Sequence, residues 1–244
     1  MKLTILGCNG PFPSAGGACS GYLIHEGGRK ILIDCGNGVL SNLQKIANFE
    51  DLDAIILTHL HSDHISDIMV LRYAIQIKIN KGILTKPLTV FAAPEPQEEY
   101  KRVDIENVFA LSPISENLVL NFDNLRITFK EMKHPVKCFA VSVENDKKKF
   151  VFSGDTSWNE NIIEFSRNSD VVMLDAGLLN SDKTSENVPH LTAGECGKVA
   201  KLSGTKKLLL THFWPEYDIN QLVSEAKENF ENVEAVKLME TYEI

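Results

Sequence analysis

The chain lacks the features that mark membrane-spanning, disulfide-bonded and nucleic-acid-coating proteins. In its 244 residues no apolar run approaches the roughly 20 residues that a membrane-spanning helix needs. The five cysteines are scattered and form no CxxC pair, which favours reduced thiols over a disulfide framework. The formal net charge is −8, so the surface as a whole does not suit indiscriminate binding to nucleic acid. A metal site could still bind a small phosphorylated substrate, because the charge of an ion overrides the global field locally.

The composition indicates a folded protein of the cytoplasm. Hydrophobic residues make up 43% of the chain and charged residues 24%, which is ordinary for a globular domain. The first residues, Met1–Leu6, have a strand pattern and none of the three regions of a secretory leader. No linker interrupts the chain. We therefore expect one domain over residues 1–244, in the cytoplasm and without a membrane partner.

Strand patterns and helix patterns alternate along the chain. Strands are predicted at residues 2–6, 21–25, 30–34, 54–58, 88–92, 118–121, 125–132, 138–143, 150–153, 171–174, 208–211 and 233–237. Helices are predicted at residues 39–46, 64–78, 159–167, 192–202 and 220–230. Thr192 and Glu195 fit a capping box at the start of the fourth of these helices. The order predicts an α/β fold with two halves, each a set of strands followed by helices.

One short segment is unusually rich in metal-binding side chains. The run His59-Leu60-His61-Ser62-Asp63-His64 holds three imidazoles and a carboxylate in six positions. Neutral imidazole and carboxylate suit zinc, manganese and iron. The residues before the run read as a buried strand, so these side chains lie at a strand end and can converge. The alternative, a His-rich surface loop, does not explain why the spacing and the strand end occur together.

Three further polar residues follow predicted strands. They are His134, Asp155 and His212, and Pro135 forces the backbone at His134 to be extended. One histidine at a strand end is more often structural than a ligand. Because core strands put their ends on one edge of a sheet, however, these groups and the histidine-rich run can meet. His25, by contrast, falls at a hairpin turn and is expected to be a solvated surface residue.

The order of these motifs resembles the metallo-β-lactamase fold superfamily. The segment HLHSDH at 59–64, the lone His134, the run SGDTS at 153–157 and His212 follow the superfamily's order. The segment Ile33–Gly36 also matches its first motif. The resemblance spans nearly the whole chain. It implies a four-layer αββα sandwich, in which two mixed β-sheets are flanked by helices.

The size of the chain resembles that of the short bacterial metallo-hydrolases of the YhfI type. Two segments narrow the resemblance to the ribonuclease Z-like phosphodiesterases. These segments are Gly17–Leu23 and the motif PHLTA at 189–193. Ribonuclease Z itself carries a long tRNA-gripping arm between its lone histidine and its bridging aspartate. Here His134 and Asp155 are separated only by two predicted strands and a turn. Cleavage of tRNA is therefore the less favoured function.

The resemblance also assigns metal ligands. The first ion would bind three imidazoles, those of His59, His61 and His134. The second would bind Asp63, His64 and His212, and Asp155 would bridge both ions. Such ligands can hold two divalent ions roughly 3.5–4 Å apart around a bridging hydroxide. Zinc is the default metal, and manganese and iron suit the same ligands.

The remaining site residues have roles that the resemblance or their position suggests. Asp63 would orient the attacking hydroxide, and His190 would protonate the leaving oxygen or help to bind the phosphate. A loop histidine beside a helix start is the alternative for His190. Asp175 stands where ribonuclease Z-like relatives have a glutamate, and is expected to hydrogen-bond His190 as a shorter substitute.

Three more residues are assigned to the surroundings of the metals. Ser20 is a candidate for substrate binding, through the loop that resembles the phosphodiesterases. Asp34 and Thr58 are candidates for the groups behind the ligands that fix imidazole tautomers. Ordinary polar residues at strand ends are an equally good interpretation of Asp34 and Thr58.

Taken together, these patterns predict a dinuclear metal-dependent hydrolase. We expect a phosphodiesterase that attacks a small or cyclic nucleotide-like phosphodiester with a metal-bridging hydroxide. The alternatives are a tRNA 3′-processing endoribonuclease, a thioester or lactone hydrolase, and a metal-binding sensor that hydrolyses nothing. A small molecule is the expected partner, nucleic acid is not favoured, and relatives suggest a homodimer.

Overall fold

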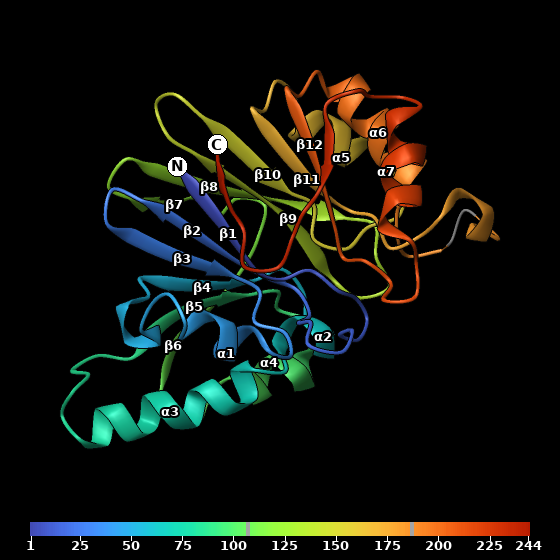
Figure 1. Ribbon diagram of the computed structural model, residues 1–244. Helices are drawn as coiled ribbons and strands as arrows, with labels where there is room; N and C mark the ends of the chain where they lie inside the picture. Colours follow the sequence, from blue (N-terminus) through green and yellow to red (C-terminus); the bar gives the residue numbers. More distant parts are fainter. Residues whose placement is uncertain (106–107, 186–187) are drawn as a thin grey trace.

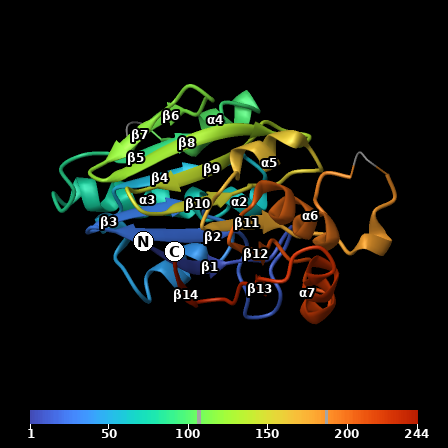
Figure 2. The same cartoon turned by 90° about the horizontal axis from the view of Figure 1, so that it is seen from above.

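Two β-sheets lie face to face, and helices cover their outer faces (Figures 1 and 2). The structure is a computed structural model that describes residues 1–105, 108–185 and 188–244. Within these residues each sheet has seven strands, and both sheets are mixed. This four-layer αββα sandwich confirms the predicted fold class.

The first sheet is formed by the N-terminal half of the chain and completed by its last strand. Its order is β14 (Thr241–Glu243), β1 (Lys2–Gly7), β2 (Gly21–Glu26), β3 (Arg29–Ile33), β4 (Ala54–Leu57), β5 (Leu88–Ala92) and β6 (Phe109–Pro113). Pairing is antiparallel from β14 to β3 and parallel from β3 to β6. The parallel part brings the carboxyl ends of β3, β4 and β5 to the same edge.

The second sheet repeats this plan. Its order is β13 (Val233–Ala235), β12 (Lys207–Thr211), β11 (Val171–Asp175), β10 (Lys149–Phe152), β9 (Cys138–Glu144), β8 (Leu125–Met132) and β7 (Leu120–Phe122). Pairing is antiparallel from β7 to β10 and parallel from β10 to β13. The carboxyl ends of β10, β11 and β12 therefore also share one edge.

Helices lie on the outer face of each sheet (Figure 1). The first sheet carries α1 (Val39–Leu43), α3 (Ile68–Asn80) and α4 (Gln97–Val103), with α2 (Ser62–Ile65) directly after β4. The second sheet carries α5 (Glu160–Phe165), α6 (Ala193–Ser203) and α7 (Ile219–Lys227). Two 3₁₀ turns, at Phe49–Asp51 and Asn180–Asp182, lie in the connections. In the described residues, no helix combines the length and apolar character needed to cross a membrane.

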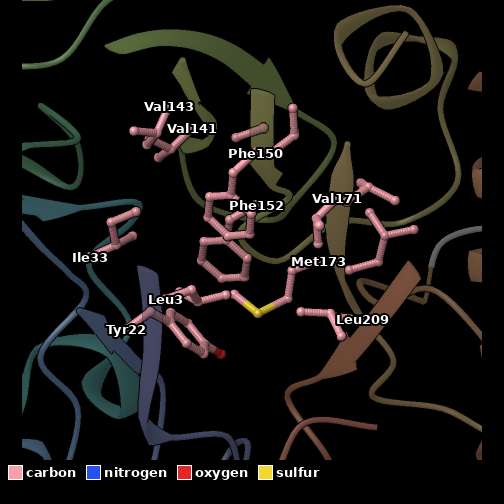
Figure 3. Packing of buried hydrophobic residues seen from close by; sticks show 14 of the residues in the cluster. Leu3, Tyr22, Ile33, Val141, Val143, Phe150, Phe152, Val171, Met173 and Leu209 are labelled. Atoms are coloured by element: carbon pink, nitrogen blue, oxygen red, sulfur yellow. The ribbon is translucent and has the colours of Figure 1, made fainter. Parts of the chain in front are cut away.

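The main core lies between the two sheets. On β3, Ile31 and Ile33 face the second sheet while Leu32 faces the helices, because successive strand side chains point to opposite faces. Figure 3 shows the inner layer, where side chains of the first sheet such as Tyr22 meet those of the second such as Phe152. The rings of Tyr22 and Phe152 lie 4.8 Å apart. This packing fixes the strand ends of the two sheets relative to each other.

The structure differs from the prediction in four elements. The helix predicted at 64–78 is divided into α2 and α3, because the backbone N–H of Asp67 donates to the carbonyl of Cys35 instead of continuing the helix. The elements α4, β6 and β14 were not predicted. β14 is three residues long and exists because it pairs with β1 at the other end of the chain.

Candidate metal centre

Seven predicted ligands converge where strand ends of both sheets meet. His59 and His61 follow β4, and Asp63 and His64 lie at the start of α2. His134 follows β8, Asp155 follows β10 and His212 follows β12. Their ligand atoms form two sets, and within each set all atoms lie within 4.8 Å of one another. The sets are His59, His61, His134 and Asp155, and Asp63, His64, Asp155 and His212. Asp155 belongs to both sets.

In the first set, hydrogen bonds leave one nitrogen of each buried imidazole facing inward. The hydroxyl of Thr58 donates to Asp34, so Nδ1–H of His59 donates to Thr58 Oγ1 at 3.2 Å and Nε2 faces Asp155. Nδ1–H of His134 donates to the carbonyl of Pro189 at 3.1 Å. His134 Nε2 then lies 3.1 Å from Nδ1 of His61. With the proton of His61 on its Nε2, both of these nitrogens present a lone pair, and a cation between them would bind both.

In the second set, Asp34 fixes the orientation of His64. His64 Nδ1–H donates to Asp34 Oδ2 at 2.8 Å, and His64 Nε2 points toward Asp155 Oδ1, 3.3 Å away. Asp34 also accepts the backbone N–H and the hydroxyl of Thr58. This position requires a left-handed backbone at Asp34, with φ 57°. Asp34 and Thr58 therefore contact the candidate ligands His64 and His59 from behind.

Asp175, at the end of β11, holds two histidines at once. Its Oδ2 accepts Nδ1–H of His190 at 2.7 Å, and its Oδ1 lies 3.4 Å from Nδ1 of His212. The two imidazole rings are stacked, with centroids 5.1 Å apart. His212 Nε2 then faces Asp63 Oδ2 at 3.2 Å. The structure thus makes the expected contact between Asp175 and His190 through Nδ1, and shows no hydrogen bond of His190 Nε2 to the described residues.

The electrostatic environment divides the histidines into two groups. Burial lowers the pKa of His59, His61 and His134, so these imidazoles are neutral, as metal ligands must be. Burial acts the same way on His64, but Asp155 and Asp34 outweigh it and raise the pKa of that imidazole to about 10. Against the opposing effect of burial, the surrounding histidines hold the pKa of Asp155 well below its usual range. Without a bound cation, a proton on His64 therefore balances the negative charge of Asp155 and Asp34.

The donor set fits divalent cations. His59 Nε2, His64 Nε2 and Asp155 Oδ1 are buried side-chain atoms without a hydrogen-bond partner in the described structure. Leaving such atoms unpaired costs about 1–3 kcal/mol each, and a cation bound between them would remove this cost. Imidazole nitrogens and carboxylate oxygens in this number suit zinc, manganese or iron.

Two glycines let the backbone approach the ligands closely. A Cβ at Gly36 would lie 1.9 Å from the carbonyl oxygen of Asp63, which explains the glycine in the segment 33–36. A Cβ at Gly10 would lie 2.0 Å from Nε2 of His212. Sequence reasoning missed Gly10 and the carbonyl of Pro189, because neither residue type signals such a role by itself.

Two predicted residues lie elsewhere. Ser20 is fully buried, and its hydroxyl accepts a hydrogen bond from Tyr22 at 3.5 Å. The expected contact of Ser20 with substrate is therefore corrected, because the whole residue, backbone included, has no exposed surface. His25 is exposed, as expected, but it lies within strand β2 and pairs with Lys30.

The αββα sandwich and the histidine–aspartate cluster at its edge define a metallo-hydrolase fold of the β-lactamase type. The chain belongs to this superfamily, because the family described as "Beta-lactamase superfamily domain" matches residues 29–213. It is 32% identical over 231 residues to "Probable metallo-hydrolase YhfI" of Bacillus subtilis, covering 94% of each protein. The crystal structure of the Bacillus subtilis YhfI protein superposes with a TM-score of 0.91, covering 99% of this chain and 98% of that one.

Ribonuclease Z proteins are further relatives. The one from Clostridioides difficile is 29% identical, and the alignment covers 95% of this chain and 94% of that protein. The alignment runs over 293 positions, more than the 244 residues of this chain, so that ribonuclease Z contains insertions absent here. The short form of human tRNase Z has the same fold, with a TM-score of 0.80 at 20% identity over 100% of this chain and 99% of that one.

Proposed function

We propose that the protein binds two divalent cations and hydrolyses a small or cyclic nucleotide-like phosphodiester. One observation carries the proposal: Asp155 is shared by two complete ligand sets, and His190 lies beside them with its Nδ1 fixed by Asp175. His59, His61 and His134 would hold one ion, and Asp63, His64 and His212 the other. Zinc is the first candidate, with manganese and iron as alternatives.

When bound, two such ions lower the pKa of water toward neutrality and neutralise the charge that builds on a phosphoryl group. The chain supplies the positioning. Asp63 has a side chain that is 10% exposed, against 3% for Asp155, so Asp63 is the carboxylate that water can reach. We assign to Asp63 the orientation of the attacking water.

His190 provides the proton for the leaving oxygen. Burial opposes a charge on this imidazole, but the Asp175 carboxylate outweighs it and raises the pKa of His190 above its usual range. The shift favours the doubly protonated ring, which is the form that can donate a proton. Nδ1–H stays with Asp175, and Nε2–H is the one to be transferred. In the pair of Asp175 and His190, a buried carboxylate thus orients the imidazole that acts as the acid.

The relatives support phosphodiester chemistry over carbonyl chemistry. Ribonuclease Z is by its name an enzyme that cleaves RNA, whose linkages are phosphodiesters. Between His134 and Asp155, however, this chain has only β9, β10 and the turn at 145–148. It has no extra segment there to grip tRNA, so a small substrate is favoured.

The test uses purified protein loaded with zinc or manganese. We expect metal-dependent hydrolysis of bis-p-nitrophenyl phosphate and of a 3′,5′-cyclic nucleotide. His190→Ala should lower kcat on the cyclic nucleotide by roughly 10²- to 10⁴-fold, because its leaving alkoxide needs a proton. The loss on bis-p-nitrophenyl phosphate should be smaller, since nitrophenolate leaves without one.

Two results would refute the proposal. One is fully metal-loaded protein that leaves both phosphodiesters intact. The other is hydrolysis of a thioester or lactone alone, at a rate that His190→Ala does not change. His25→Ala serves as the matched control, because His25 is exposed and lies outside the cluster.

A further inference from the structure

Phe12 and Trp214 form an exposed aromatic pair on the surface. Their ring centroids are 5.4 Å apart and their planes are inclined by 77°, so the edge of one ring meets the face of the other. Such a contact covers at most one face of either ring. Phe12 is 41% exposed and Trp214 is half-buried. A flat apolar face therefore remains open to solvent.

The pair lies beside the candidate metal centre. The loop that carries Phe12 is fastened to the segment after β12, because Gly10 N–H donates to the carbonyl of Phe213 at 3.1 Å. The α-carbon of Gly10 lies close to Nε2 of His212, because a Cβ at Gly10 would be only 2.0 Å from that nitrogen. Phe12 is two residues beyond Gly10, and Trp214 is two residues beyond His212. Two residues span at most about 7 Å, so the α-carbons of Phe12 and Trp214 lie within about that distance of those of Gly10 and His212.

The hydrophobic core does not explain Phe12, and Trp214 approaches the core through Tyr217, whose ring centroid lies 6.4 Å from that of Trp214. Neither belongs to the core clusters of the described chain, nor to the apolar side chains packed against them. In the described residues, the other clearly exposed aromatic is Tyr73, which is 51% exposed and lies on α3, on the far side of the first sheet. Single exposed apolar residues are common. A pair of aromatics beside a polar, metal-ligating cluster instead fits one part of a ligand site.

We propose that Phe12 and Trp214, the aromatic platform, stack against the base of a nucleotide substrate. The inference rests on the proposed phosphodiesterase function and narrows its substrate to phosphodiesters of nucleosides. Stacking on an aromatic ring accepts any base, because every base has a flat π face. The platform thus selects nucleotides over aliphatic phosphodiesters, without preference for one base.

The test compares two ligands that differ only in the base. AMP and ribose 5-phosphate are titrated by calorimetry into metal-loaded protein. We expect AMP to bind roughly 5- to 150-fold more tightly, the range for one base stacked on an aromatic side chain. Phe12→Leu and Trp214→Leu should each reduce this ratio and leave the affinity for ribose 5-phosphate unchanged. Tyr73→Leu is the matched control and should change neither affinity.

A second measurement reports on the ring itself. The chain has two tryptophans, so Trp158→Phe leaves Trp214 as its sole tryptophan. AMP should quench its fluorescence, and ribose 5-phosphate should not. Equal affinities of the unaltered protein for AMP and ribose 5-phosphate would contradict the stacking proposal. An equal loss of affinity for both ligands in the Leu variants would contradict it as well.

The two proposals fail in different ways. Methyl p-nitrophenyl phosphate is a phosphodiester without a base. If it is hydrolysed while AMP has no advantage over ribose 5-phosphate, the platform is wrong and the phosphodiesterase stands. If neither sugar phosphate binds and no phosphodiester is hydrolysed, both proposals are wrong.

Discussion

Asp34 shows how much the candidate centre depends on a single residue outside the ligand set. It is fully buried, and its carboxylate is bonded to His64 and to two groups of Thr58. Its backbone is in the left-handed region, which costs energy for a residue other than glycine. Strain of this kind persists where the surroundings fix it, and here they fix the ring of His64.

Replacing Asp34 with Asn should weaken metal binding without unfolding the protein. Asparagine tolerates a positive φ, but its neutral amide no longer holds Nδ1–H of His64 as a carboxylate does. We expect the affinity for one of two ions to fall about 10- to 100-fold, as for other groups behind metal ligands. Competition with a chromogenic chelator measures it.

The control for this substitution is Asp170→Asn. Asp170 is also a buried aspartate, but it bonds to Lys149 and Lys206 far from the ligands. Unchanged affinity in Asp34→Asn, or an equal loss in Asp170→Asn, would show that the contact with His64 has no role in metal binding.

The convergence of the candidate ligands could be predicted from the sequence because imidazoles and carboxylates at strand ends are rare and chemically distinctive. His134 and Asp155 could be located this way although they lie far along the chain from His59. Phe12 and Trp214 could not, because an aromatic residue in a loop has the same local signature whether it is buried, exposed or next to a site. The position of these two aromatics beside the site depends on the contact between Gly10 and His212. That contact joins residues far apart in the sequence and forms only in the folded chain.

At the scale of elements, α6 was predicted correctly at its start because its signal is local. Thr192 Oγ1 accepts Glu195 N–H at 3.1 Å, and the Glu195 carboxylate accepts Thr192 N–H at 3.0 Å. Both partners lie within one turn, so the sequence contains the whole interaction. The strand β14 has no such local signal. It is formed by pairing with Lys2–Thr4, which only the folded chain brings near.

Thr192→Ala should lower the free energy of unfolding by about 1 kcal/mol, within a range of roughly 0.5–2 kcal/mol. The substitution leaves the backbone N–H of Glu195 without its acceptor at the start of α6. Urea denaturation followed by circular dichroism measures the change. Thr192→Ser keeps the hydroxyl and should retain most of the stability. If both variants were equally destabilised, the loss would come from packing of the methyl group and not from the cap.

At the scale of the whole molecule, the candidate ligands come from both sheets. His59 and His61 extend from the first sheet, whereas His134, Asp155 and His212 extend from the second. A cation bound by both groups exists only when the sheets are packed together, so binding stabilises the folded state over the unfolded one. The same distribution explains why the sequence could predict which residues form the site but not the distances between their ligand atoms. Those distances depend on how the two sheets pack.

Removing the metals should therefore lower the melting temperature of the entire protein. At a free ion concentration of 100 Kd, one bound ion adds about 2.7 kcal/mol. For a chain of this size about 1 kcal/mol corresponds to 2–4 °C, so we expect a decrease of roughly 5–10 °C per ion after chelation. Scanning calorimetry before and after chelation, and after zinc is restored, measures it. Identical melting temperatures would contradict a structural contribution from metal.

The size of this metal effect should increase with pH. Without metal, Asp155 and Asp34 raise the pKa of His64 to about 10 against the effect of burial, so this ring is protonated between pH 6 and 8. The proton must leave before an ion can bind, and it competes more strongly at pH 6 than at pH 8. The same proton stabilises the metal-free fold fully below the unfolded pKa, about 6.5, and progressively less toward pH 10. These are two descriptions of one exchange of proton for metal, which makes the rise in melting temperature on adding zinc larger at pH 8 than at pH 6. A rise that is equal at the two pH values would mean that His64 does not exchange its proton for a metal ion.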